Sequence, residues 1–279
     1  MERSLSTDKI LPVTSVRSGS VKEVVEGVHC LTLQVVNVYL IGKPGVSNDW
    51  VLVDAGMPHS GDKILKTAEK LFGPDHRLKA IVLTHGHFDH VGGIIDILEK
   101  HKVPVYAHPL EFPYLSGEDD YPAADPTVGG GLVAKMSPLF PVEAINISEH
   151  LQALPADGGI LEMPGWKWFH TPGHSPGHVS LFRMHGSVLL AGDAFVTVKQ
   201  ESVYDVMLQR RKIHGPPSYL TTDWKAAEAS VNLLVGLWPS VAATGHGKTM
   251  RGAKLAKELV ELADNFKRLA VPKQQLPIN

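Results

Sequence analysis

The feature that most constrains this chain is the turn Thr84-His85-Gly86-His87-Phe88-Asp89-His90, which places three imidazoles and a carboxylate within six residues. The apolar run before it, Ala80-Ile81-Val82-Leu83, is typical of a strand buried on both faces. Apolar positions recur at helical spacing from Gly92 to Lys100. The turn therefore joins a strand to a helix. Imidazole and carboxylate suit zinc, iron or manganese, so we predict a metal site here.

Three later turns carry the same residue types after strand-like runs. His174 lies in a turn rich in Pro and Gly after residues 166–169, Asp193 follows the run 187–192, and His246 follows the run 240–245. Loops along one edge of a sheet are where α/β enzymes assemble their sites. The alternative, a polar surface turn with chance histidines, does not account for four such strand ends. We expect seven ligands from four turns.

Taken together, these turns match a family signature. The chain resembles the metallo-β-lactamase-fold hydrolase superfamily, whose signature is a His-x-His-x-Asp-His turn followed by a distant His, Asp and His. The run 51–56, in which Asp54 ends a strand, resembles the first motif of that family. The resemblance extends from the strand-rich N-terminal region through His246. It implies an α/β fold, the four-layer αββα metallo-β-lactamase sandwich.

Carried over to this sequence, the resemblance implies two divalent metal ions, with zinc favoured over iron or manganese. The expected ligands are His85, His87 and His174 for the first ion, Asp89, His90 and His246 for the second, and Asp193 as a bridge between them. Asp54 and His178 are expected to orient these ligands and their loops without binding a metal ion themselves. The β-lactamases of the superfamily use Cys or Ser at the bridging position, so Asp193 disfavours that activity. His87 stands where the flavo-diiron branch carries Glu, which disfavours that branch too.

The predicted function is a metal-dependent hydrolase that cleaves a carboxylic ester, lactone or thioester. A hydroxide shared by the two ions would attack the carbonyl carbon, and Asp89 would act as the catalytic residue that orients it and carries a proton. Two other reactions stay open, since this fold also includes a mononuclear-iron oxidoreductase of the persulfide dioxygenase type and phosphoesterases. A metal-binding module without catalysis is a further class of hypothesis.

Two irregular segments interrupt the expected strands and helices. The first covers about 111–141 and contains five prolines, and the second covers about 195–223. Long irregular inserts in a compact domain are usually lids, binding loops or oligomer contacts. In quorum-sensing lactonases of this fold a Tyr often follows the bridging Asp, but Asp193 is followed here by Ala, Phe and Val. Tyr204 and Tyr219 are therefore candidates for substrate binding.

Length and composition indicate one globular domain over residues 1–279, because 43% hydrophobic residues can bury a large core. The net charge is −2, and Arg210-Arg211-Lys212 is the only compact basic run, so we expect a small-molecule substrate and neither nucleic acid nor membrane. A homo-oligomer stays open. The first nine residues lack an apolar signal run, and the single cysteine, Cys30, has no disulfide partner, which favours the cytoplasm.

The remaining pattern predicts the elements around these turns. Short strands are expected between residues 20 and 57, and a further strand over 103–107. Helices are expected over 60–73, 224–238 and 253–269. Cys30 falls in one of the short strands and is expected to be a structural thiol.

Overall fold

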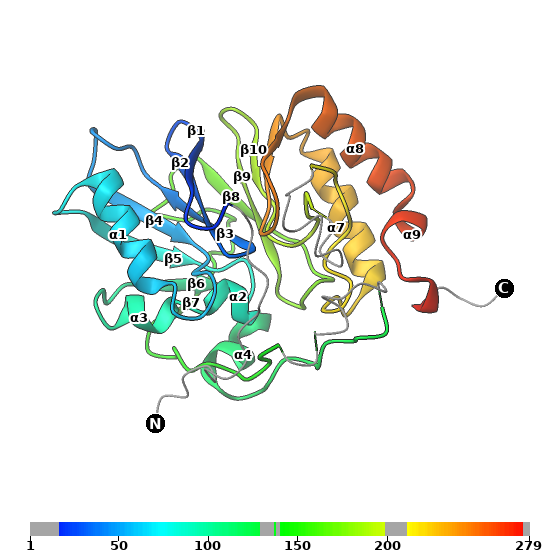
Figure 1. Ribbon diagram of the computed structural model, residues 1–279, viewed down its shortest axis with the longest axis horizontal. Helices are drawn as coiled ribbons and strands as arrows, with labels where there is room; N and C mark the ends of the chain where they lie inside the picture. The colour runs from blue at the N-terminus through cyan, green and yellow to red at the C-terminus, as the bar shows by residue number, and fades with distance from the viewer. Residues whose placement is uncertain (1–16, 129–136, 138–139, 199–210, 276–279) are drawn as a thin grey trace. The chain divides into compact units, whose positions relative to one another are not determined.

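A computed structural model of the chain describes residues 17–128, 137, 140–198 and 211–275. The chain divides into two compact units, each containing a β-sheet with helices (Figure 1). Unit 1 comprises residues 1–121 and 141–164, and unit 2 comprises residues 122–140 and 165–279. The expected mixed α/β class is confirmed. A single domain over residues 1–279 stays a prediction.

The sheet of unit 1 runs in sequence order from β1 to β7. Its strands are β1 (Val21–Val25), β2 (Val28–Leu33), β3 (Val36–Ile41), β4 (Asp49–Val53), β5 (Arg77–Val82), β6 (Val105–Ala107) and β7 (Leu151–Ala153). Pairing is antiparallel from β1 to β4 and parallel from β4 to β7. The strands expected between residues 20 and 57 and over 103–107 are present. Strand β7 was not predicted, because its residues are partly or fully exposed and form no apolar run.

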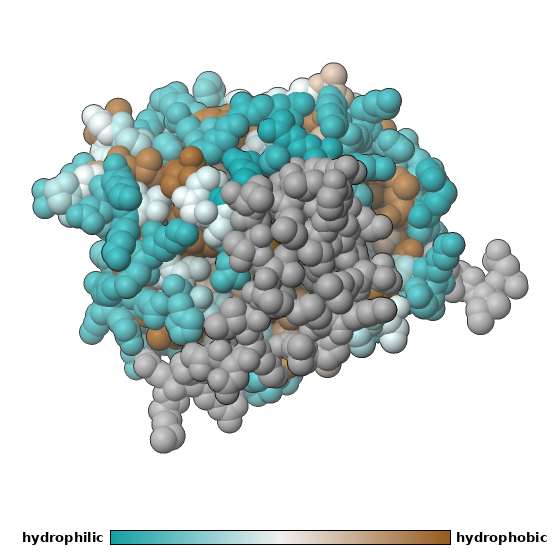
Figure 2. All heavy atoms as spheres, viewed as in Figure 1, coloured by the Kyte–Doolittle hydropathy of each residue, from teal (hydrophilic) through white to brown (hydrophobic). Residues whose placement is uncertain are grey.

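The helices of unit 1 are short except for the first. They are α1 (Gly61–Phe72), α2 (Phe88–Val91), α3 (Ile94–Leu98), the 3-10 turn η1 (Pro109–Glu111) and α4 (Phe112–Ser116). The buried face of α1 carries Ile64, Ala68 and Phe72 at a spacing of four residues. Figure 2 shows hydrophilic side chains over its outer face.

Two helical expectations in unit 1 need correction. The helix predicted from Gly92 begins earlier, at Phe88, and is divided into α2 and α3 at Gly92 and Gly93. The backbone approaches its neighbours closely here, since a Cβ at Gly92 would lie 2.2 Å from the Pro58 nitrogen. The segment 111–141 is not irregular throughout, because α4 occupies its first residues.

The sheet of unit 2 has the order β12-β11-β10-β9-β8. Its strands are β8 (Trp166–His170), β9 (Val179–Arg183), β10 (Val188–Leu190), β11 (Val241–Ala243) and β12 (Met250–Arg251). Only β10 and β11 pair in parallel among these neighbours; the other pairs are antiparallel. The predicted strands of this unit are present. Strand β8 extends one residue beyond the predicted run 166–169, whereas β10 and β11 are shorter than the runs 187–192 and 240–245. Neither β9 nor β12 was predicted, although β9 directly follows the turn that contains His174.

Helices α7 (Trp224–Gly236) and α8 (Gly252–Asp264) lie side by side in unit 2 and share one buried cluster with the sheet (Figure 1). The Asp223 side chain caps α7 by accepting a hydrogen bond from the Ala226 N–H at 2.9 Å. The helix predicted over 253–269 is interrupted at Asn265, after which come α9 (Phe266–Leu269) and the 3-10 turn η3 (Lys273–Gln275). Phe266 is buried in the same cluster, so the break turns its ring inward.

Candidate metal centre

Unit 1 gathers four of the predicted ligands in the turn after β5. His85, His87, Asp89 and His90 are all buried. The imidazole of His85 lies 4.6 Å from that of His87 and 4.1 Å from that of His90, measured between ring centroids. A carboxylate oxygen of Asp89 is within 4.8 Å of a nitrogen of His90. Helix α2 begins directly after His87, so Asp89 and His90 stand on a helical turn while His85 and His87 precede it.

Asp54 lies behind this turn, at the end of β4. Its backbone has φ +60°, in the left-handed region that Asp tolerates better than most residues, and such strain is common at functional sites. Asp54 Oδ2 is 2.8 Å from His90 Nδ1. Thr84 donates its N–H to Asp54 Oδ1 at 2.8 Å and its hydroxyl to Oδ2 at 2.9 Å. The buried carboxylate therefore holds both the turn and one of its imidazoles.

These bonds assign the tautomers of two imidazoles. Because the Thr84 hydroxyl gives its proton to Asp54, its oxygen accepts from His85 Nδ1, which is 3.0 Å away. His90 Nδ1 likewise donates to the Asp54 carboxylate. In a neutral imidazole with the proton on Nδ1, the lone pair is on Nε2. His85 and His90 thus carry their lone pair on Nε2, the atom through which each could bind a metal ion.

Unit 2 gathers the other three predicted ligands around one carboxylate oxygen. Asp193 Oδ2 lies 3.2 Å from His246 Nε2 and 3.6 Å from His174 Nε2, and the three side chains are buried. Ligand atoms bound to one tetrahedral zinc at about 2.0–2.2 Å are separated by roughly 3.3–3.6 Å. The separations in unit 2 agree with ligands that share an ion, whereas 3.6 Å is too long for a direct hydrogen bond.

The orientation of His174 is set by its turn and by a threonine. Gly173 has φ +128°, and a Cβ there would lie 2.3 Å from the Ala227 nitrogen, so the turn requires glycine. The Thr221 hydroxyl donates to the Pro217 carbonyl at 2.8 Å, and its oxygen lies 3.3 Å from His174 Nδ1. Thr221 therefore accepts the Nδ1 proton, and the lone pair of His174 is on Nε2, the atom that could bind a metal ion. Nothing in the sequence pattern had indicated Thr221.

His178 is close to the ligands but has another contact. Its Nε2 accepts the Asp193 backbone N–H at 2.9 Å, and its Nδ1 lies 3.1 Å from the Thr171 carbonyl, to which it donates. With Nε2 engaged by a backbone donor, this imidazole supports the peptide of Asp193 and does not offer that nitrogen to a metal ion.

Tyr219, Tyr204 and Cys30 were also singled out from the sequence. Tyr219 is buried, its ring packs edge-on against Phe140 at 5.6 Å, and its carbonyl accepts the Asp125 N–H at 2.8 Å. Tyr204 lies outside the described residues. Cys30 is partly buried in β2, and desolvation of its thiol raises the pKa to about 11. A thiol held protonated in this way suits the structural role expected of it.

Two residues next to the unit 1 ligands were missed by the sequence analysis. Glu111 and Tyr121 are buried, and both accept the Gly86 N–H, at 2.9 Å each. They fall in the segment 111–141, which was expected to be a loop, so the pattern carried no signal for them.

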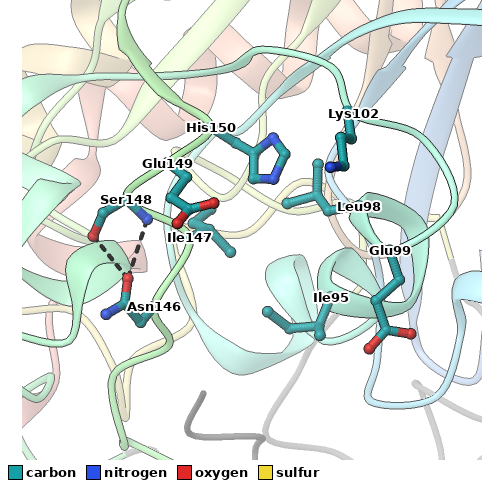
Figure 3. A pocket seen from close by; sticks show the side chains of 9 residues that line it. All are labelled: Ile95, Leu98, Glu99, Lys102, Asn146, Ile147, Ser148, Glu149 and His150. Atoms are coloured by element: carbon teal, nitrogen blue, oxygen red, sulfur yellow. Dashed lines mark hydrogen bonds between the residues drawn. The ribbon is translucent and has the colours of Figure 1, made fainter. Parts of the chain in front are cut away.

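A hollow of about 360 Å³ in unit 1 contains none of the predicted ligands (Figure 3). It is lined by Ile95, Leu98, Glu99 and Lys102 around α3 and by residues 146–150. The lining mixes acidic, basic and apolar side chains and shows no converging ligand set. This hollow is therefore separate from the candidate metal centre.

The comparisons with known proteins agree with this geometry. The sequence model of the metallo-beta-lactamase superfamily matches residues 31–246. The chain is 51% identical over 260 residues to the probable metallo-hydrolase YflN of Bacillus subtilis (strain 168), covering 93% of this chain and 98% of that protein. It is 30% identical over 201 residues to the probable metallo-hydrolase YybB of the same organism, covering 72% and 77%.

Solved structures show the same fold. The structure of TTHA1623 in a di-iron-bound form superposes with a TM-score of 0.55 at 28% identity, covering 80% of this chain and 93% of that one. A B3 metallo-beta-lactamase with an active-site glutamic acid superposes with a TM-score of 0.60 at 20% identity, covering 88% and 87%. The expected metallo-β-lactamase fold is thereby confirmed. Among the described residues, no helix is long and apolar enough to span a membrane.

Proposed function

This chain belongs to the metallo-beta-lactamase superfamily, and we propose that it is a dinuclear hydrolase of a carboxylic ester, lactone or thioester. At the family level it is a metallo-hydrolase with histidine and aspartate groups able to bind metal. One observation carries the finer proposal: His174 Nε2 and His246 Nε2 both approach Asp193 Oδ2, as expected of a carboxylate shared by two ions.

The donor set, imidazole and carboxylate, suits two divalent ions. The proposed assignment is His85, His87 and His174 for one ion, Asp89, His90 and His246 for the other, and Asp193 for both. The chemistry supports it, because imidazole and carboxylate without thiolate suit zinc, iron or manganese. The outer partners of His85, His90 and His174 support it further, since each leaves Nε2 as the ligand atom. Zinc is proposed, with iron as the alternative, because the similar protein TTHA1623 has a di-iron-bound form.

When bound by these residues, divalent ions would lower the pKa of a water molecule toward 7 and polarise a substrate oxygen. The protein groups would supply orientation and proton transfer. Asp89 is buried, and we propose that its carboxylate accepts a proton from the attacking water and passes it to the leaving alkoxide or thiolate. Asp54 would keep His90 and Thr84 in place throughout this transfer, so the ligand nitrogens need no reorganisation.

The substrate class follows from the bridging residue and from the irregular segments. The proposal favours esters, lactones and thioesters over β-lactams, because Asp193 stands where the β-lactamases of this superfamily carry Cys or Ser. The segments around 111–141 and 195–223 are proposed to shape specificity for a small molecule, with Tyr204 and Tyr219 as candidate contacts. No nucleic-acid substrate is proposed, since the chain has a net charge of −2.

The test combines metal analysis with a substrate panel. The panel contains aryl esters, lactones, thioesters and phosphoesters. Purified protein should contain two zinc equivalents and turn over members of the first three classes. His246→Ala should lose one metal equivalent and most of the turnover. His150→Ala, a histidine that lines the hollow of Figure 3, is the control and should keep both. One iron equivalent with oxygen uptake on a persulfide would replace the hydrolase with the oxidoreductase, and turnover confined to phosphoesters would replace it with a phosphoesterase.

A further inference from the structure

A buried carboxylate that the proposed reaction does not use lies beside the first ligand turn. Glu111, at the end of η1, has no solvent exposure. Its Oε2 accepts the Gly86 N–H at 2.9 Å and a short hydrogen bond from the Tyr121 hydroxyl. Burying a carboxylate is costly unless donors satisfy it, and these two donors meet that need.

Tyr121 links this carboxylate to a ligand imidazole. Its ring centroid lies 4.5 Å from that of His87, and the ring also stacks on that of Tyr114 at 3.9 Å. The Tyr121 hydroxyl donates to Glu111 Oε2 and accepts the Gly86 N–H, so it connects the carboxylate to the ligand turn.

Gly86, between His85 and His87, is fitted closely to this pair. A Cβ at Gly86 would lie 2.7 Å from the Tyr121 hydroxyl oxygen and 3.1 Å from Leu115 Cδ2. Only glycine allows the peptide to approach near enough for its N–H to reach both oxygens. The turn is thus held on one side by Asp54, through Thr84, and on another by Glu111 and Tyr121.

We propose that Glu111 and Tyr121 are positioning residues that fix the peptide between His85 and His87, and with it the His87 ring, for metal binding. The inference rests on the proposed function, since it assumes that His85 and His87 are ligands. Removing an outer partner of a metal ligand typically weakens metal affinity or activity by about 10–100-fold. Glu111 and Tyr121 would therefore change the metal affinity without contacting the ion.

The experiment measures metal affinity of the intact chain by competition with a chelator, using zinc and then cobalt. Tyr121→Phe deletes one hydroxyl and keeps the ring against His87. Tyr114→Phe is the matched control, since it deletes a hydroxyl from the ring stacked on Tyr121 and has no hydrogen bond to Gly86. We expect Tyr121→Phe to weaken binding of the first ion by about 10-fold and to shift the visible spectrum of the cobalt form. Tyr114→Phe should change neither.

Glu111→Gln is the second variant. Thermal unfolding of each protein without metal is measured as well, so that a loss of folding stability is distinguished from a loss of metal affinity. A Tyr121→Phe protein with wild-type affinity and cobalt spectrum overturns the inference, whatever its unfolding temperature. Equal losses in Tyr121→Phe and Tyr114→Phe also overturn it, because the effect would then come from ring packing. If wild-type protein and His85→Ala bind zinc equally, the proposed function itself fails. If His85→Ala weakens binding and Tyr121→Phe does not, only the inference fails.

Discussion

His90 Nδ1 lies 2.8 Å from Asp54 Oδ2, and both side chains are buried. The same carboxylate accepts two hydrogen bonds from Thr84, whose oxygen in turn accepts from His85. One residue at the end of β4 therefore orients two imidazoles that are proposed to serve different ions. Because Asp54 supports both imidazoles, we predict that substituting it lowers the affinity for both metal ions together.

Asp54→Asn should lower the affinity for both metal equivalents by about 10-fold or more, since an amide offers one acceptor oxygen where the carboxylate offers two. Metal titration of the metal-free protein measures this. Asp62→Asn is the control, because Asp62 pairs with Lys100 on the surface. Loss of one equivalent with the other unchanged would contradict the shared role of Asp54.

Thr221→Val should lower the affinity for the ion assigned to His174 by about 10-fold, because valine cannot accept the His174 Nδ1 proton. The affinity for the other ion should change less. Thr67→Val is a matched control, since that threonine is also buried and donates only to Lys63 within α1. Affinities are read by stepwise chelator competition. Identical curves for both variants and wild type would remove Thr221 from the site.

Gly86→Ala should weaken metal binding strongly in the wild-type background and less strongly in Tyr121→Phe. The added Cβ would meet the Tyr121 hydroxyl oxygen at 2.7 Å, and phenylalanine lacks that atom. A double-mutant cycle on metal affinity gives the coupling between the two positions. Strict additivity would show that the Gly86 methyl and the Tyr121 hydroxyl do not compete for this space.

The Cys30 thiol should lose its proton only near pH 11. Desolvation raises the pKa of its thiol from 9.0 to about 11, so the native state keeps the proton where the unfolded chain loses it. The contribution of this thiol to the free energy of unfolding is fully present below pH 9 and is lost as the pH rises through about 11. Thiol modification of native protein should therefore remain slow at pH 9 and accelerate toward pH 11. A rate that levels off by pH 9, or loss of metal in Cys30→Ser, would contradict the structural role.

The sequence predicted those parts of the molecule that depend on local pattern. The apolar runs before the ligand turns became β5, β10 and β11, because a buried strand needs a continuous apolar run. The aromatic-rich run 166–169 became β8, whose side chains are mostly partly exposed. The spacing of Ile64, Ala68 and Phe72 likewise predicted α1.

What the sequence could not predict depends on contacts between distant residues. Glu111 and Tyr121 reach Gly86 across 25 and 35 residues, and Thr221 reaches His174 across 47. No local pattern marks such a partner, because its role arises only when the chain is folded. The helix breaks at Gly92 and Asn265 were missed for a similar reason: close backbone approach at Gly92 and burial of Phe266 override helical spacing.

Anomalous X-ray diffraction from crystals of the zinc-loaded protein tests the central claim most directly. The account predicts two zinc peaks per chain. One should be bound by His85, His87 and His174, the other by Asp89, His90 and His246, with Asp193 touching both. A single peak, or peaks without these ligands, would contradict it.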